Sequence, residues 1–241
     1  MSEPPRSYAQ RWESYWSEVT KKGTRVMWDV AKEDGVALDW PNIQPFVDPS
    51  LPMVHLGCGH GRQTAFFGDH FERVLGVDIS PTAIARAERE NPHERVEYRV
   101  LDAMDHEAIA ALHDELGDAN VYVRGVLHQL APDDQLPFLE PTLQLIGDRG
   151  TLCVLELRRG AEQIFFPLVK MGLLSFLRPV LDNGIKPLGI TPKRFRELVP
   201  DTHEVVSSRP TVLMRLPLPL PLPFKVPAWH MAVRKLAPTV Q

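Results

Sequence analysis

The sequence predicts an α/β fold built on a mostly parallel, doubly wound sheet. The first observation is an apolar segment, Val54–Leu56, that runs into a glycine-rich turn and is followed by a second apolar segment, Val74–Asp78. The second is the recurrence of apolar segments separated by stretches of helical length, at 96–101, 120–128 and 151–157. Strands that alternate with helices form a parallel sheet with helices on both faces. With 241 residues and 44% hydrophobic composition, the chain suits one domain, 1–241, with a sizeable core.

The glycine-rich turn and Asp78 have the pattern of the front half of a nucleoside-cofactor site. Glycines let the chain turn tightly and let backbone N–H groups approach a ligand closely. Asp78 stands at the tip of the second strand, 21 positions after the first glycine, where it can accept hydrogen bonds from ribose hydroxyls. Nicotinamide and flavin enzymes use G-x-G-x-x-G, whose third glycine would fall where this chain has Arg62. The spacing therefore disfavours a dehydrogenase.

The turn Gly57–Gly61, with its G-x-G-x-G spacing, and the motif Asp78-Ile79-Ser80 resemble the cofactor half of the class I S-adenosylmethionine (SAM)-dependent methyltransferases. The resemblance covers roughly residues 50–157, the expected SAM-binding half. It implies a Rossmann-like, seven-stranded, mostly parallel sheet that closes with a C-terminal antiparallel hairpin. It also implies SAM as cofactor, S-adenosylhomocysteine as product, and a reaction without a metal.

The resemblance assigns the cofactor contacts to residues that follow the first three strands. These are Gly57, Cys58, Gly59 and Gly61 for close backbone approach, Asp78 for the ribose, Ile79 for the adenine face, and Asp102 with Ala103 for the adenine edge. Asp102 can alternatively cap the next helix, a common role for aspartate at such a junction.

The later elements agree with the family in order. They are a fourth strand at 120–128, a helix at 133–146, the turn Gly147–Gly150, a fifth strand at 151–157, and a C-terminal helix and hairpin within 191–241. Leu216–Pro223 alternates leucine with proline, so an extended connector before the last strand, 229–234, is expected there.

The tip of the fourth strand faces the transferable methyl group in this family, which makes His128 and Gln129 the candidate catalytic residues. Methyl transfer from a sulfonium is an in-line displacement, so catalysis can come mainly from placing the acceptor correctly. A base is optional: His128 can accept a proton, orient the acceptor, or serve the structure alone.

Residues 1–45 form an extension rich in tryptophan, and Trp12 and Trp16 are spaced to share one face of a helix. This helix can pack on the sheet edge, or it can form a lid over the cofactor and the acceptor. A tryptophan-rich leader of the second kind is similar to the thiopurine-methyltransferase-like branch, and it would bring Trp16 and Trp28 to the substrate.

Residues 158–190 form an apolar insertion after the fifth strand. Ligands of open α/β sheets bind beyond the carboxyl ends of the strands, so the insertion is placed to shape the acceptor pocket. Phe165, Phe166 and Met171 are the expected substrate contacts. A dimer contact or a membrane-surface contact remains an alternative for so much apolar surface.

Composition excludes several classes of function. A net charge of −4 and scattered lysines and arginines leave no basic field for nucleic acid. Only Cys58 and Cys153 are present, which predicts neither a disulfide framework nor a metal site and favours the reducing cytoplasm. Charges and prolines interrupt the most apolar stretch, 165–181, so no stable membrane span is expected, and the protein is expected to be a monomer or homodimer.

The acceptor is expected to be a hydrophobic small molecule. The Asn/Asp-Pro-Pro-Tyr motif of amide and nucleobase N-methyltransferases is absent from the segment 124–129. A carboxylate needs no base, only donors such as Gln129 or an arginine, and the apolar insertion suits an alkyl tail; this pattern resembles bacterial fatty-acid O-methyltransferases. S-methylation of a small thiol, as in the thiopurine-like branch, and a non-catalytic SAM-binding protein remain open.

Overall fold

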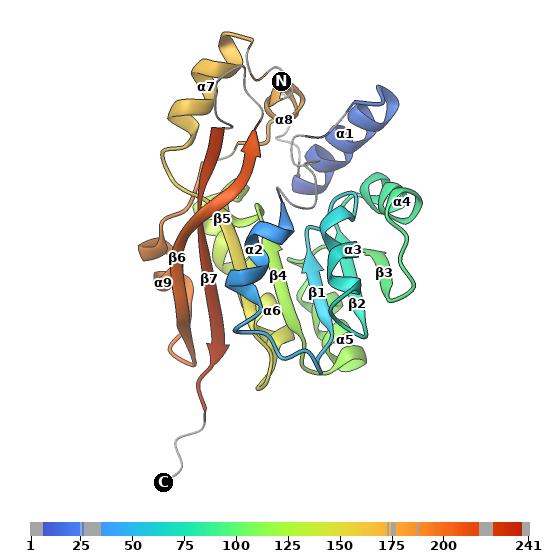
Figure 1. Ribbon diagram of the computed structural model, residues 1–241, viewed down its shortest axis with the longest axis vertical. Helices are drawn as coiled ribbons and strands as arrows, with labels where there is room; N and C mark the ends of the chain where they lie inside the picture. The colour runs from blue at the N-terminus through green and yellow to red at the C-terminus, as the bar shows by residue number, and fades with distance from the viewer. Residues whose placement is uncertain are drawn as a thin grey trace, which may run out of the picture.

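A computed structural model describes residues 7–24, 26, 35–172, 174, 177–186, 188–216 and 224–237. Seven strands form one sheet in the order β3-β2-β1-β4-β5-β7-β6 (Figure 1). β1 to β5 run parallel, and β7 lies antiparallel between β5 and β6. The strands are β1 Met53–Leu56, β2 Val74–Asp78, β3 Val96–Val100, β4 Asn120–Arg124, β5 Leu152–Leu157, β6 His203–Leu216 and β7 Phe224–Lys235. The predicted fold class, including the C-terminal antiparallel hairpin, is confirmed.

Helices cover both faces of the sheet. They are α1 Tyr8–Lys21, α2 Val36–Ile43, α3 Arg62–Gly68, α4 Pro81–Glu90, α5 His106–Leu116, α6 Gln135–Ile146, α7 Glu162–Lys170, α8 Arg178–Asp182 and α9 Pro192–Leu198. Side-chain oxygens of Ser80, Asp105 and Thr191 accept the first free backbone N–H groups of α4, α5 and α9, as expected for N-caps.

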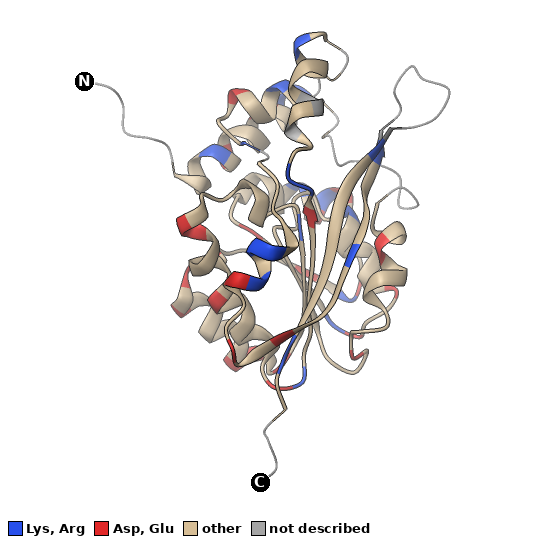
Figure 2. Ribbon diagram, turned by 90° about the vertical axis from the view of Figure 1, so that its left-hand side faces the viewer, with Lys and Arg blue, Asp and Glu red and all other residues tan. Residues whose placement is uncertain are grey.

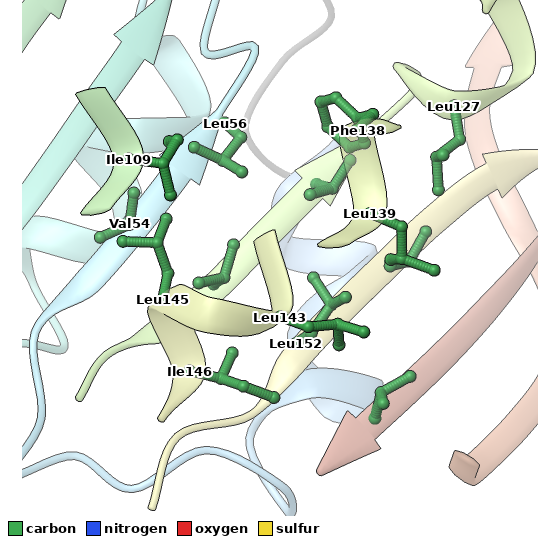
Figure 3. Packing of buried hydrophobic residues seen from close by; sticks show 14 of the residues in the cluster. Val54, Leu56, Ile109, Leu127, Phe138, Leu139, Leu143, Leu145, Ile146 and Leu152 are labelled. Atoms are coloured by element: carbon green, nitrogen blue, oxygen red, sulfur yellow. The ribbon is translucent and has the colours of Figure 1, made fainter. Parts of the chain in front are cut away.

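Alternating strand residues supply two separate cores. One face of β1, β4 and β5 packs against α5, α6 and α9, and Figure 3 shows Ile109 of α5 and Leu139 and Leu143 of α6 in this cluster with Leu56 of β1. The opposite face packs against α2 and α3, where Phe67 contributes a fully buried ring. This division follows from the period of two along a strand, and it holds the carboxyl ends of the parallel strands in line.

The fourth strand is shorter than predicted. It ends at Arg124 rather than at 128, and Leu127–Gln129 forms a 3-10 turn instead. Gly125 leaves the strand with a φ of +71°, and the next three backbone N–H groups point to the carboxylate of Glu156 rather than to a neighbouring strand. Pro217–Pro223 of the leucine–proline segment lies outside the described residues, and it links β6 to β7, which pair up to Leu216 and Phe224.

Charged residues of both signs are interspersed over the ribbon (Figure 2). Among the helices that the structure describes, none is long and apolar enough to cross a membrane.

Two histidines, His55 on β1 and His230 on β7, are buried within the sheet. Burial, with a nearby arginine in each case, lowers the pKa of His55 to about 3 and that of His230 to about 4. Below pH ~6.5 the unfolded chain therefore binds more protons than the folded one. Protonation of these histidines in the unfolded chain does not reduce the free energy of unfolding above that pH, but it reduces it progressively as the pH falls toward 4.

Replacing His230 by phenylalanine is expected to reduce the loss of stability between pH 7 and pH 5 by about 1–2 kcal/mol, because phenylalanine takes up no proton. Neither ring nitrogen of His230 has a hydrogen-bond partner within the described residues, so the substitution breaks no such bond. Urea unfolding at both pH values measures the effect, with His106→Phe at an exposed position as control. Equal pH dependence in wild type and His230→Phe would contradict the assignment.

Candidate active site

A pocket lies where the parallel strands end. Its walls come from the segments that follow β1, β2, β3 and β4, from α1, from the 158–190 insertion and from the β6–β7 hairpin. In Figure 1 the parallel strands point toward the end of the molecule where α1, α7 and α8 lie. The sheet reverses its order between β1 and β4, and open α/β sheets bind ligands at such a switch point.

The glycine-rich turn forms one wall of this pocket. Gly57, Gly59 and Gly61 have φ values of +72°, +57° and +81°, a region that disfavours side chains. A Cβ atom on Gly57 would lie 2.6 Å from Cγ2 of Val126, which also lines the pocket. The turn thus offers a cradle of bare backbone, with Gly57, Cys58 and Gly59 in the pocket wall and Gly61 behind them at the start of α3.

Asp78 connects this turn to the next helix. Its Oδ2 accepts a hydrogen bond from the Gly59 N–H at 2.9 Å, and its Oδ1 accepts one from the Ser80 N–H at 3.0 Å. The side chain is buried but lines the pocket, and desolvation raises the pKa of Asp78 to about 6. A carboxylate oxygen accepts more than one hydrogen bond, so both oxygens retain capacity for ribose hydroxyls.

The other predicted cofactor residues also line this pocket. Ile79, Asp102 and Ala103 lie beside Asp78 around its wall. Asp102 accepts a hydrogen bond from the Met104 N–H, whereas the N-cap of α5 is Asp105, so the alternative role of Asp102 as helix cap is wrong. The bare backbone, the carboxylate and the apolar Ile79 fit the nucleoside of SAM.

Helix α1 contributes Tyr8, Trp12 and Trp16 to the wall of the pocket. At one end, the Tyr8 hydroxyl donates to Oδ2 of Asp134 at 2.7 Å and accepts from the Ala131 N–H at 2.8 Å. In its second turn, Glu13 accepts hydrogen bonds from Ser80 and Thr82 at the start of α4. The helix therefore bridges the two rims of the pocket.

The part of the 1–45 segment that follows α1 does not line the pocket within the described residues. Trp28, predicted at the substrate, lies outside the described residues. α2 packs on the far face of the sheet, where Trp40 stacks on His70 with ring centroids 4.3 Å apart. The two alternatives concerned the helix that carries Trp12 and Trp16: both residues line the pocket, while its role as a lid stays a prediction.

Glu13→Ala is expected to weaken SAM binding about fivefold, roughly 1 kcal/mol, because the hydrogen bonds between α1 and the start of α4 are lost. Calorimetric titration with SAM measures this effect. Glu18→Ala is the matched control, since Glu18 lies on the same helix but bonds Lys22 and Asn183, away from α4. An unchanged affinity in Glu13→Ala would show that these bonds do not support the cofactor site.

The segment after β4 brings His128 and Gln129 to the pocket. The His128 Nδ1 lies 2.6 Å from Oε2 of Glu156, which is fully buried on β5. Glu156 also accepts the backbone N–H groups of residues 126–128. The Gln129 amide donates to the Gly125 carbonyl, and its Oε1 is buried without a partner in the described part of the chain.

Glu156, which holds the turn after β4 and the His128 ring, is a residue that the sequence analysis missed. The available signal was a single charged residue inside the otherwise apolar strand Leu152–Leu157. A charged side chain is almost never buried in a strand without hydrogen-bond or ionic partners, so the sequence already indicated that Glu156 contacts such a partner elsewhere in the fold.

Arg124, at the end of β4, is the second residue that was missed. It lines the pocket, its Nε lies 3.4 Å from Oδ2 of Asp39, and its guanidinium also donates to the Leu213 carbonyl. Asp39 is fully buried on α2, and desolvation raises its pKa to about 7 despite Arg124 and the hydrogen bond from the Tyr122 hydroxyl. Arg124 is thus a cationic residue in the wall of a mostly apolar pocket, with its guanidinium held by Asp39 and the Leu213 carbonyl.

The 158–190 insertion supplies an apolar zone of the pocket. Phe166 lines the pocket as expected, while nothing is described for the side chain of Phe165. Met171 is a correction: it directly follows α7, is 71% exposed and does not line the pocket. The reason is the helical period, which turns Val169 inward and leaves Met171 facing solvent.

The apolar zone is shared between the insertion and the hairpin. Its residues are Leu157, Phe166, Val169, Leu177, Val180, Leu181, Ile185, Leu213, Met214 and Val226. Most of these residues also form one buried cluster with Leu155 and Leu174, so the insertion packs its apolar side chains within the chain itself. Among the described residues, no group of three or more histidines, cysteines and carboxylates is placed to hold a metal ion.

Comparisons with known proteins show the family of this chain. A family model described as a methyltransferase domain matches residues 54–154. A SAM-dependent methyltransferase from Anabaena variabilis ATCC 29413 is 30% identical, with a TM-score of 0.89 and 98% of each chain covered. No curated protein sequence matches significantly.

Two more distant structures share the fold. One comes from work on the conversion of a disulfide bond into a thioacetal group during echinomycin biosynthesis (18% identity, TM-score 0.70, covering 95% of this chain and 92% of that chain). The other is 1,6-didemethyltoxoflavin-N1-methyltransferase from Burkholderia thailandensis, with S-adenosylhomocysteine bound (18% identity, TM-score 0.58, covering 98% and 94%). From its sequence, its fold and its pocket, this chain belongs to the SAM-dependent methyltransferases.

Proposed function

We propose that this methyltransferase acts on a small, mostly apolar acceptor bound between α1, the 158–190 insertion and the β6–β7 hairpin. The observation that carries the proposal is one pocket lined both by the nucleoside-binding residues and by the apolar zone. Pockets of this kind, apolar with a few convergent polar groups, are typical of small-molecule sites.

SAM supplies an electrophilic methyl group on a sulfonium. The protein's part is to hold the nucleoside at Asp78 and the glycine-rich turn, and to orient the acceptor beside the residues that follow β4. Apolar walls exclude water from the reacting atoms, and correct placement accounts for much of the rate of such a displacement.

The first candidate acceptor is a carboxylate such as a fatty acid. The supporting observation is Arg124, a cationic residue that lines the same pocket as the apolar zone that would receive an alkyl chain. A charge-assisted hydrogen bond orients a carboxylate well, and a carboxylate needs no base at neutral pH.

The second candidate is a small thiol or another nucleophile that carries a proton. The supporting observation is His128, which lines the pocket with Nδ1 held by Glu156. Such an imidazole is suited to accept a proton from the acceptor.

We also propose that the enzyme works in a reducing compartment such as the cytoplasm, on small molecules rather than nucleic acid. Two free, buried cysteines and interspersed charges support these proposals.

A panel of acceptors distinguishes the candidates. Medium-chain fatty acids, aliphatic and aromatic thiols, and phenols are incubated with labelled SAM, and S-adenosylhomocysteine is measured. Turnover of fatty acids that stops when the carboxyl group is blocked would establish carboxyl O-methylation. Turnover of thiols or phenols alone would establish the second candidate, and SAM binding without any turnover across the panel would contradict the proposed acceptor class and favour a binding protein.

A further inference from the structure

The carboxylate of Glu156 has an unusual set of partners for a residue inside a parallel sheet. It is fully buried and accepts three backbone N–H groups, from Val126 at 3.0 Å, Leu127 at 2.9 Å and His128 at 3.2 Å. The imidazole Nδ1 of His128 lies 2.6 Å from the same carboxylate. One side chain of β5 therefore organises both the turn after β4 and the ring that this turn carries.

This contact determines which ring nitrogen faces the pocket. With Nδ1–H donating to Glu156, the second nitrogen, Nε2, is the hydrogen-bond acceptor. Nε2 has no hydrogen bond in the described part of the chain and is not among its buried, unpartnered atoms, while the ring lines the pocket. His128 thus presents a free lone pair to whatever occupies the pocket beside the cofactor site.

We infer that Glu156 is a positioning residue that holds His128 as a general base, and that the natural acceptor therefore carries a proton on its nucleophilic atom. The inference rests on the proposed function and selects the protic class, thiol or hydroxyl, over a carboxylate. A carboxylate is already ionised and makes no use of a base held in this way.

The proton and the electrons balance without a further reactant. His128 Nε2 takes the proton of the acceptor, the acceptor sulfur or oxygen forms the bond to the methyl carbon, and the electron pair of the broken carbon–sulfur bond returns to sulfur as S-adenosylhomocysteine forms. Glu156 stabilises the resulting imidazolium by an opposite charge at hydrogen-bond distance, as the carboxylate of a catalytic triad does.

The test compares two acceptors of similar shape: an aromatic thiol that is ionised at the assay pH, and a phenol or alkyl thiol that is not. We expect His128→Asn and Glu156→Gln each to lower kcat about 100-fold for the un-ionised acceptor. With the ionised acceptor, kcat of the same variants should fall less than about tenfold, because no proton has to be removed. Glu140→Gln, at an exposed position of α6, is the control with unchanged rates.

Calorimetric SAM affinity and circular dichroism of each variant separate this role from a structural one. His128→Asn leaves Glu156 and the backbone bonds of the turn in place, so it tests the base even where Glu156→Gln disturbs the turn. Equal losses with both acceptors, no loss with either, or turnover by wild type of carboxylates alone overturns the inference and leaves the proposed function standing. Absence of wild-type turnover with every acceptor overturns the proposed function as well.

Discussion

Replacing Gly61 by alanine should destabilise the protein by about 2–5 kcal/mol and remove measurable SAM binding at ordinary concentrations. Gly61 has a φ of +81°, which costs an alanine roughly 1–2 kcal/mol. Its Cβ would also lie 2.6 Å from the hydroxyl oxygen of Tyr98. Tyr98 cannot easily move, because it is buried and its hydroxyl lies 2.8 Å from the Asn91 carbonyl oxygen, to which it can donate its one proton, and 3.2 Å from that of Gly61.

Gly117→Ala is the matched control for this prediction. Gly117 has a φ of +69° at the end of α5, but no atom lies within 4 Å of the Cβ it would acquire. Gly117→Ala therefore lowers the free energy of unfolding only through its unfavourable backbone conformation, and it should leave SAM affinity unchanged. Denaturant unfolding and calorimetry measure both quantities, and equal effects at the two glycines would contradict the role assigned to the packing of Tyr98.

Asp78→Ala is expected to weaken SAM binding at least tenfold, a loss of about 1.5–3 kcal/mol for hydrogen bonds to a charged group. The substitution removes the acceptor for ribose hydroxyls and also leaves the Gly59 and Ser80 N–H groups without their carboxylate. Asp105→Ala is the control, because it too removes a backbone N–H acceptor, at the start of α5, but Asp105 does not line the pocket. Unchanged calorimetric affinity in Asp78→Ala would remove Asp78 from the cofactor site.

The pH dependence of SAM binding gives a second test of Asp78. Burial raises its pKa to about 6, and the ionised form is the better acceptor for ribose hydroxyls. Binding below pH 6 therefore requires release of a proton, so affinity should fall by up to about tenfold per pH unit as the pH decreases. Asp78→Asn should bind more weakly than wild type at pH 7.5 and lose this dependence. A wild-type affinity that stays constant from pH 7.5 to 5 would contradict the prediction.

The cofactor half could be predicted from sequence because its requirements are local. The positive φ values of Gly57, Gly59 and Gly61 demand glycine, and the apolar strands alternate with helices along the chain. The position of Asp78 follows from the strand that it ends. Such features depend on neighbours in the chain, so their spacing can be recognised before the fold is known.

The acceptor side depended on residues that are distant in the chain. After Gly125 the fourth strand does not continue, because Glu156, about 30 positions later, takes the backbone N–H groups of residues 126–128. The sequence analysis predicted Met171 in the pocket only because this residue is apolar, whereas the direction of α7 turns it to solvent.

The sequence by itself therefore determined the fold class and the methyltransferase family, and it predicted a nucleoside cradle most of whose residues line one pocket. Only the tertiary structure decided that Glu156 meets His128 and that Asp39 meets Arg124, pairs separated by 28 and 85 positions. The physical reason is that a buried charge must find its partner in space. The pattern of one strand reveals that a partner is needed, but the packing of sheet and helices determines which residue it is.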